Sequence, residues 1–390
     1  MLLYIHVPFC VQKCSYCAFY SIPLRGQKEE APSILARFPE TLIGEMRFQR
    51  QQLGPREITS IFFGGGTPSL LSSENVAKIL WAANDCFSIR AGAEISMEAN
   101  PQSALAPGWM REVRAVGVNR LSLGVQSLDA QALALLGRLH TPEEAARAMG
   151  EARSAGFSNL GLDLIWGLPR PSRPKDTMTS LSRWLTTLQT ALALEPDHVS
   201  AYNLTLEPGT PLEALVAGGA VTMPTEDEEK AMYLEGIALM DRHGLFQYEV
   251  SNFARPGYEC RHNLGYWQGL EYLGLGPSAV SCMGETRRTN PPDLAAWEKQ
   301  VTAQGQAEAS KETLSVAIRL EERLMLGLRQ KKGLDLDHWE EAGGRPLPAP
   351  LLKALEEAGY CEPAERRLAL TPLGMLLSNS IIAALFESIA

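Results

Sequence analysis

Six short apolar runs, each followed by a segment that can form a helix, constrain the fold of this chain more than any other feature. Near-continuous apolar runs indicate strands buried on both faces, and their alternation with helices predicts a parallel sheet covered by helices. Right-handed β-α-β connections can close such a sheet wholly or partly into a barrel. We therefore predict an α/β fold. Its predicted strands span residues 2–8, 58–64, 94–99, 120–126, 160–166 and 198–205.

Polar and glycine residues gather where five of these strands end. Ligand sites in barrels of this kind lie at the C-terminal ends of the strands. The alignment of such residues over five strands therefore predicts one site at that edge of the sheet. The residues concerned are the cysteines from Cys10 onward, Gly64–Pro68, Glu98–Asn100, Gln126–Ser127 and Asp163.

Three cysteines, Cys10, Cys14 and Cys17, stand within eight residues directly after the first strand. A structural zinc site needs four protein ligands, and the other cysteines (Cys86, Cys260, Cys282 and Cys361) form no second pair. Three thiolates can instead hold an iron–sulfur cluster and leave one iron open; the alternative is a disulfide with a spare thiol. The CxxxCxxC spacing resembles the radical S-adenosylmethionine (SAM) superfamily, whose 4Fe-4S cluster takes SAM on the open iron. We expect Tyr16, inside this loop, to pack against the adenine edge of SAM.

The remaining polar residues suit the chemistry of SAM, which carries an ammonium, a carboxylate and ribose hydroxyls. Glu98 suits the ammonium, Arg138 can form a forked pair with the carboxylate, and Gln126 and Asp163 suit the hydroxyls. The Gly64–Pro68 turn lacks the Lys-Ser/Thr of a phosphate loop. Its glycines instead allow the backbone to approach a ligand closely.

Composition limits the class of protein. A net charge of −9 and a pI near 5.4 argue against nucleic acid as the main partner. Seven irregularly spaced cysteines do not suggest an extracellular disulfide framework. The N-terminus does not read as an export signal, and no apolar stretch approaches the length of a membrane span. We expect a soluble cytoplasmic protein.

The second half of the chain suggests a boundary. A capping box at Thr225–Glu228 predicts a helix that stops near Gly244. Polar sequence from 286 to 312 reads as a linker, which gives three parts: 1–285, 286–312 and 313–390. The last part shows helical patterns at 313–330 and 348–359, a hairpin-like stretch at 361–370 and a last helix from about 372. It looks like a small winged-helix unit, and its few basic residues favour a packing or lid role over DNA binding.

A second group of chemically active residues lies downstream, at Arg261–Trp267. His262 beside Tyr266 and Trp267 could bind a flat aromatic cofactor with the histidine as iron ligand. The alternative is a packed aromatic corner. His6, on the first strand, also allows two interpretations: it could act near the cluster, or it could satisfy a hydrogen bond in the core.

Four motifs together resemble the oxygen-independent coproporphyrinogen III oxidases and their relatives, over essentially the whole chain. That family has a partial (β/α)6 radical SAM barrel followed by a helical C-terminal domain, and the resemblance implies this fold here. The motifs are Tyr4–Cys10, Gly64–Pro68, Gly124–Ser127 and Asp163–Pro169.

Two features point to the haem-chaperone branch of this family rather than to the oxidases. Phe19 stands where the true oxidase has a fourth cysteine, and the chain begins three residues before Tyr4, without the oxidase's longer N-terminal extension. His262–Trp267 also matches the HNxxYW signature of that branch. The resemblance therefore favours a role of this motif connected with haem.

The resemblance implies cofactors, partners and sites. The cofactors are a 4Fe-4S cluster, SAM and haem, and the partners are respiratory or storage haemoproteins, with a homodimer and a peripheral membrane contact left open. The rival interpretation is the oxidase, which decarboxylates two propionates of coproporphyrinogen III. His262 is the candidate haem ligand, and His6 and Cys260 are the alternatives. Tyr266 and Trp267 would supply an aromatic wall for the haem. Cys10, Cys14 and Cys17 would hold the cluster, and the SAM site would comprise Tyr4, Gly65, Gly66, Thr67, Glu98, Gln126, Arg138, Asp163 and Asn203.

Overall fold

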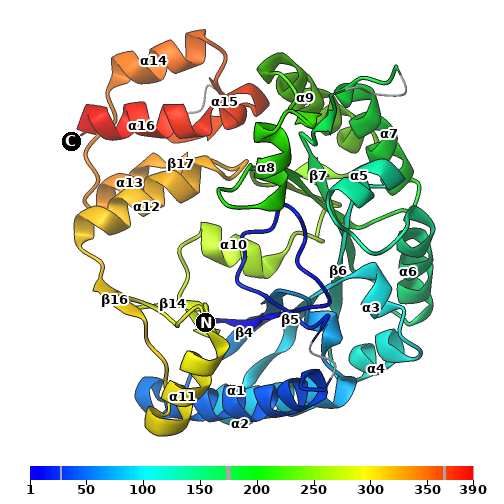
Figure 1. Cartoon of the computed structure of the whole chain (residues 1–390). Coiled ribbons are helices and arrows are strands. Elements are labelled where there is room, and N and C mark those ends of the chain that lie inside the picture. The colour runs from blue at the N-terminus through cyan, green and yellow to red at the C-terminus, as the bar shows by residue number, and fades with distance from the viewer. Residues whose placement is uncertain (27–28, 173–176, 363–365, 390) are drawn as a thin grey trace.

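The computed structural model describes residues 1–26, 29–172, 177–362 and 366–389, and its centre is an open sheet of 12 strands (Figure 1). Six neighbouring strands of this sheet are parallel and coincide with the six predicted ones, so the α/β prediction is confirmed. Their order is β9-β7-β6-β5-β4-β1. They are β1 (Leu2–Val7), β4 (Ile58–Gly65), β5 (Ile89–Ala99), β6 (Arg120–Gln126), β7 (Leu160–Trp166) and β9 (His198–Asn203).

Helices cover the outer face of the parallel strands, as the connections of a parallel sheet require. Figure 1 shows α1 and α2 below the sheet and α6 and α7 beside it. The predicted capping box is present: the Thr225 hydroxyl accepts a hydrogen bond from the Glu228 N–H, and the Glu228 carboxylate accepts one from the Thr225 N–H. The helices are α1 (Ala31–Leu53), α2 (Ser73–Phe87), α3 (Pro101–Ala104), α4 (Trp109–Ala115), α5 (Ala130–Leu135), α6 (Pro142–Ser154), α7 (Ser180–Leu192), α8 (Pro211–Ala217) and α9 (Glu226–Arg242).

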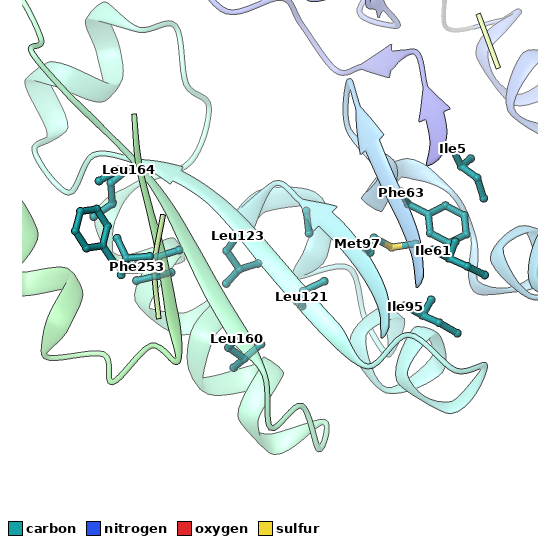
Figure 2. Close-up of a cluster of buried hydrophobic side chains, with 14 of the residues drawn as sticks. Ile5, Ile61, Phe63, Ile95, Met97, Leu121, Leu123, Leu160, Leu164 and Phe253 are labelled. Atoms are coloured by element: carbon teal, nitrogen blue, oxygen red, sulfur yellow. The ribbon is translucent and has the colours of Figure 1, made fainter. Parts of the chain in front are cut away.

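The hydrophobic core lies between these helices and the sheet. Figure 2 shows Ile61 and Phe63 of β4, Met97 of β5, and Leu121 and Leu123 of β6 projecting from neighbouring strands. All five side chains are fully buried. Their burial removes apolar surface from water, which is the main stabilising contribution to such a sheet.

The stretch 286–312 is not a polar linker, because it forms part of the main sheet. A seventh parallel strand, β13 (Tyr272–Leu275), pairs with β1 and is followed by antiparallel β14 (Val280–Met283), β15 (Thr286–Thr289) and β16 (Ser310–Thr313). Between the last two, α11 (Leu294–Gln304) buries Trp297 against α1. The Glu45 carboxylate of α1 accepts hydrogen bonds from Trp297 Nε1 (3.0 Å), Asn290 Nδ2 (2.8 Å) and the Gly276 N–H (2.9 Å).

At its other end the sheet continues through two short strands, β12 (Asn252–Ala254) and β11 (Phe246–Gln247). Between β12 and β13 the chain forms α10 (Arg261–Trp267), whose residues contact β4. Short strands complete this part: β2 (Phe9–Cys10), β3 (Ile22–Pro23), β8 (Arg170–Pro171) and β10 (Val221–Thr222).

The C-terminal segment packs helices on a three-stranded sheet at one side of the molecule (Figure 1). The two predicted helical patterns correspond to α12 (Val316–Leu328) and α14 (Ala349–Glu357); of the predicted hairpin, residues 363–365 lie outside the described residues. Within the described parts of the chain, no helix combines the length and apolarity needed to cross a bilayer. The other elements are β17 (Leu334–Asp335), α13 (Leu336–Glu341), β18 (Cys361–Glu362), β19 (Arg367–Leu370), α15 (Pro372–Leu376) and α16 (Ser378–Ile389).

Candidate functional site

A cavity of about 470 Å³ lies at the C-terminal ends of the parallel strands. It brings together nearly all residues predicted to bind the cluster and SAM, although they come from separate strands and loops. Tyr4 is the exception, because its side chain lines a second cavity. The predicted residues in the wall of the first are Cys10, Cys14, Tyr16, Cys17, Gly65, Gly66, Thr67, Glu98, Gln126, Arg138, Asp163 and Asn203.

The cysteine loop is fixed to the turn that follows α5. The Ser15 N–H donates to the Leu136 carbonyl (3.1 Å), and Ser15 Oγ donates to the Leu135 carbonyl (2.7 Å). Gln12 Nε2 donates to the Gly137 carbonyl (2.9 Å). Three hydrogen bonds between segments over 100 residues apart hold the loop in place, so the positions of the cysteines are set by tertiary contacts.

The thiols have neighbours that stabilise sulfur ligands. Thr67 Oγ1 donates to Cys10 Sγ, and Arg138 Nη1 donates to Cys14 Sγ, each at 3.5 Å. Burial raises the pKa of the Cys17 thiol, so forming the thiolate costs free energy in the absence of iron. Binding of iron by the thiolate can offset that cost. Hydrogen bonds of this kind to sulfur also tune an iron–sulfur cluster.

This donor set fits a cluster better than a single metal ion. Within the described residues, no three His, Cys, Asp or Glu side chains converge closely enough to hold one ion. A cubane cluster does not need such convergence, because each thiolate binds a different iron atom. Three thiols around one cavity therefore fit a 4Fe-4S cluster with one open iron.

The glycine turn after β4 has no room for side chains. Gly65 has a φ of +107°, and a Cβ there would lie 2.6 Å from the His6 ring. A Cβ on Gly66 would lie 2.6 Å from the Phe9 carbonyl oxygen. The Gly66 N–H donates to the Val7 carbonyl (2.8 Å), which joins the turn to the start of the cysteine loop. Glycine is therefore required at Gly65 by the positive φ and the nearby His6 ring, and at Gly66 by the nearby Phe9 backbone.

Two charged side chains of the cavity, Glu98 and Arg138, lack a full set of partners among the described residues. Burial, followed by the charge of Asp163, raises the pKa of Glu98 to about 8. Its carboxylate accepts one hydrogen bond, from the Gly65 N–H at 3.2 Å. The Arg138 Nη2 donates to the Gly124 carbonyl, while the buried Nε has no hydrogen-bond partner among the described residues. A ligand with a cationic and an anionic group would satisfy both side chains.

Gln126 and Asp163 complete this wall of the cavity. Gln126 has a φ of +66°, at a bulge where β6 pairs with β7, and such a conformation costs energy for a residue other than glycine. Asp163 Oδ1 accepts a hydrogen bond from Ser122 Oγ at 2.9 Å, and burial raises its pKa. Strain and buried charge at one place are typical of ligand sites.

A second cavity, of about 1060 Å³, adjoins the first and reaches the C-terminal helices. Phe19, Gly65 and Glu98 line both cavities. The Phe19 side chain is 71% exposed, so its ring is accessible to a ligand in either cavity. Tyr266 and Trp267 line the second cavity as well, so a flat ligand there would lie next to the cysteine cavity.

His262 lines neither cavity and is not placed to bind iron. It is fully buried; its Nδ1 is hydrogen-bonded to Ser60 Oγ (2.8 Å) and its Nε2 to the Tyr266 hydroxyl (3.0 Å). Burial lowers its pKa to about 3, so the ring stays neutral at physiological pH. The Glu94 carboxylate accepts hydrogen bonds from the Arg261 and His262 N–H groups (3.0 Å each) and thereby fixes the start of α10. The histidine thus positions Tyr266.

The two alternative haem ligands are also engaged elsewhere. His6 lines the second cavity, but its Nδ1 is hydrogen-bonded to the Tyr4 hydroxyl and its Nε2 to the Tyr20 carbonyl, both at 3.1 Å. Cys260 is fully buried, lines neither cavity, and its thiol donates to Glu94 at 3.5 Å.

Sequence reasoning missed several residues of the second cavity. Cys282 and His338 carry sulfur and nitrogen donors, and Arg287, Arg319 and Arg323 carry positive charge. Cys282 on β14 and Arg287 on β15 are cross-strand partners. The polar sequence that begins at residue 286 gave no sign that this region forms strands. Arg319 and Arg323 stand four apart in a predicted helix, and that spacing alone places them on one face.

Comparison with known proteins agrees with this arrangement. The model of the radical SAM superfamily matches residues 4–178, and that of the HemN C-terminal domain matches residues 314–377. The haem chaperone HemW of Bacillus subtilis is 33% identical over 385 residues, which cover 98% of each chain. The chain belongs to the HemW family of radical SAM proteins. HemW of Escherichia coli is 39% identical over 71% of this chain and 68% of its own.

Two further matches are to proteins with other names. A mitochondrial protein of Bos taurus, radical S-adenosyl methionine domain-containing protein 1, is 39% identical over 87% of this chain and 75% of its own. The solved structure of coproporphyrinogen III oxidase (HemN) from Escherichia coli superposes with a TM-score of 0.80 at 25% identity, covering 98% of this chain and 89% of that one. The predicted family and the predicted radical SAM fold are therefore confirmed.

Proposed function

We propose that this protein is a haem chaperone that binds haem and a SAM-ligated 4Fe-4S cluster and transfers haem to respiratory or storage haemoproteins, in the cytosol or at the membrane. One observation carries the proposal: two cavities share a wall, the smaller with three thiols and the larger with an aromatic lining. The relatives named HemW support it, because they are haem chaperones by name and match nearly the whole chain.

In this proposal the smaller cavity is the cofactor site. Cys10, Cys14 and Cys17 hold the cluster, which when bound supplies an electron and an open iron for SAM. The unpaired Nε of Arg138 and the buried Glu98 receive the charged amino-acid end of SAM. Gln126, Asp163 and Asn203 bind its ribose.

The larger cavity is the haem site. Haem is a flat apolar ring with two carboxylates. The aromatic side chains of Tyr266 and Trp267, which line this cavity, have the size and shape to contact such a ring. The rival function, oxidation of coproporphyrinogen III, would place a substrate with four carboxylates there. Phe19 argues against the rival, because it stands where the resembling oxidases have a cysteine, in the wall common to both cavities. A phenyl ring there has no ionisable proton and cannot take part in thiol chemistry.

One anaerobic preparation with a reconstituted cluster tests both functions in parallel. Haem titration should give a saturable Soret shift, and haem-loaded protein should pass its haem to an apo-haemoprotein. Incubation with coproporphyrinogen III, SAM, a reductant and an electron acceptor should give no protoporphyrinogen. Catalytic formation of protoporphyrinogen would overturn the chaperone proposal and favour the oxidase.

A further inference from the structure

The larger cavity has two chemically different sides. One group of lining residues comes from α10 and the start of β13, and another comes from α12 and α13 of the C-terminal segment. Figure 1 shows α10 below α12 and α13 in the view. At about 1060 Å³, the cavity is at the upper end of the range for small-molecule sites, so it can hold a ligand larger than SAM.

The α10 side is a rigid aromatic wall. The Tyr266 hydroxyl is held by His262 Nε2 (3.0 Å), and the Tyr266 ring meets that of Tyr272 edge to face, with centroids 4.7 Å apart. Trp267 follows in the same wall, and Leu270 is 47% exposed. Fixed aromatic groups lose little conformational entropy when they bind a flat apolar ligand.

The opposite side carries positive charge on α12. Arg319 and Arg323 stand four residues apart, so they project from the same face of the helix. Two like charges at this spacing destabilise a helix slightly unless something neutralises them. Arg319 meets Glu285 in an exposed pair (3.0 Å), whereas Arg323 donates to the His338 carbonyl (3.3 Å) and has no carboxylate partner among the described residues.

Among the described residues, three acidic side chains line this cavity, Glu98, Glu322 and Asp335, and none of them pairs with Arg319 or Arg323. The Glu322 carboxylate pairs with Arg287. Asp335 pairs with Arg367 at 2.8 Å and also caps α13. Arg323 is therefore left without a carboxylate partner among the described residues, and Arg319 has only the exposed carboxylate of Glu285, which lies outside the cavity wall.

We propose that haem binds in this cavity with its ring against Tyr266 and Trp267 and its two propionates on Arg319 and Arg323. The inference rests on the proposed function and gives it an orientation. An apolar ring with two carboxylates on one edge matches a cavity that is lined by both an aromatic wall and two arginines. Guanidinium groups bind carboxylates in a forked geometry that lysine cannot reproduce. Two arginines also suit a dicarboxylate better than the four carboxylates of coproporphyrinogen.

The test compares two ligands on full-length protein by titration in the Soret region: haem, and haem dimethyl ester, whose propionates are masked. Arg319→Gln and Arg323→Gln should each weaken haem binding about tenfold, as expected for loss of a charge-assisted hydrogen bond. The wild type should prefer haem over the ester, and the double variant should lose that preference. Lys353→Gln is the control, because it removes an exposed positive charge from α14, outside the cavity, and should leave binding unchanged.

The outcomes separate this inference from the proposed function. If the wild type binds neither ligand, the haem-chaperone proposal itself fails. If the wild type binds haem but both arginine variants bind it equally well at unchanged thermal stability, the propionates lie elsewhere and the inference is overturned. Equal affinity of the wild type for haem and its ester would also overturn it.

Discussion

Replacing His262 should destabilise the protein rather than remove a haem ligand. The His262→Ala variant leaves two buried groups, Ser60 Oγ and the Tyr266 hydroxyl, without their partner. Each buried group left unpaired costs about 1–3 kcal/mol, and the lost ring leaves a cavity beside Phe62, whose centroid lies 5.3 Å away. We expect a loss of about 3–6 kcal/mol, a large part of the ~5–15 kcal/mol stability of a typical domain.

The pH dependence of stability gives an independent measure of the same histidine. Its pKa of about 3 lies below the usual 6.5, so the neutral ring contributes stability that is present above pH 6.5 and is lost as the pH falls toward 3. At pH 4.5 this loss is about 3 kcal/mol. His262→Gln cannot titrate, so its stability should fall by about that much less between pH 7 and pH 4.5 than that of the wild type.

Urea unfolding followed by circular dichroism measures both effects, and the Soret titration is run on the same samples. His243→Ala is the matched control, because His243 is an exposed residue at the C-terminal end of α9 and should change stability little. Unchanged stability in His262→Ala together with a lost or altered Soret band would refute this reasoning and make the histidine a ligand. A destabilised but folded variant that still gives the wild-type Soret band would confirm it.

Three further predictions concern the smaller cavity and the sheet extension. Gly66→Ala should reduce the iron retained after reconstitution, because its Cβ would lie 2.6 Å from the Phe9 carbonyl, while Gly150→Ala, with open space around it, should not. SAM affinity, measured by calorimetry, should rise about tenfold from pH 6 to pH 7 as Glu98, with its pKa of about 8, loses its proton, and should be flat in Glu98→Gln. Burial raises the pKa of Glu45 to about 7, so its effect on stability is most favourable below pH 4.5 and declines as the pH rises through 7. The stability that urea unfolding shows to be lost between pH 6 and pH 8 should therefore be about 1 kcal/mol smaller in Glu45→Gln than in the wild type, because Glu98 still titrates in both proteins.

The sequence alone predicted the parallel strands and the smaller cavity, for a physical reason. Strands buried on both faces leave a continuous apolar signal, and a parallel sheet gathers their C-terminal ends at one edge. Residues as far apart as Cys10 and Asp163 could therefore be assigned to one site without any knowledge of their contacts. The extension through β14–β16 left no such signal, because these strands are mostly half-exposed or exposed and carry polar side chains such as Arg287 and Arg288.

The environment of His262 was hidden from the sequence for a different reason. Its partner Ser60 lies 202 positions away, on β4, and the Glu94 that fixes the start of α10 lies on β5. A histidine beside a tyrosine and a tryptophan has the residue types of a haem site, but only tertiary contacts decide whether its nitrogens are free. Here Glu94 accepts a hydrogen bond from the His262 N–H, and Ser60 is hydrogen-bonded to the His262 ring. The ring in turn is hydrogen-bonded to the Tyr266 hydroxyl and positions that side chain at the cavity. In the proposed haem site the HNxxYW motif would therefore shape a wall of the cavity rather than supply an iron ligand, while Cys282 and His338 are donors that line the same cavity.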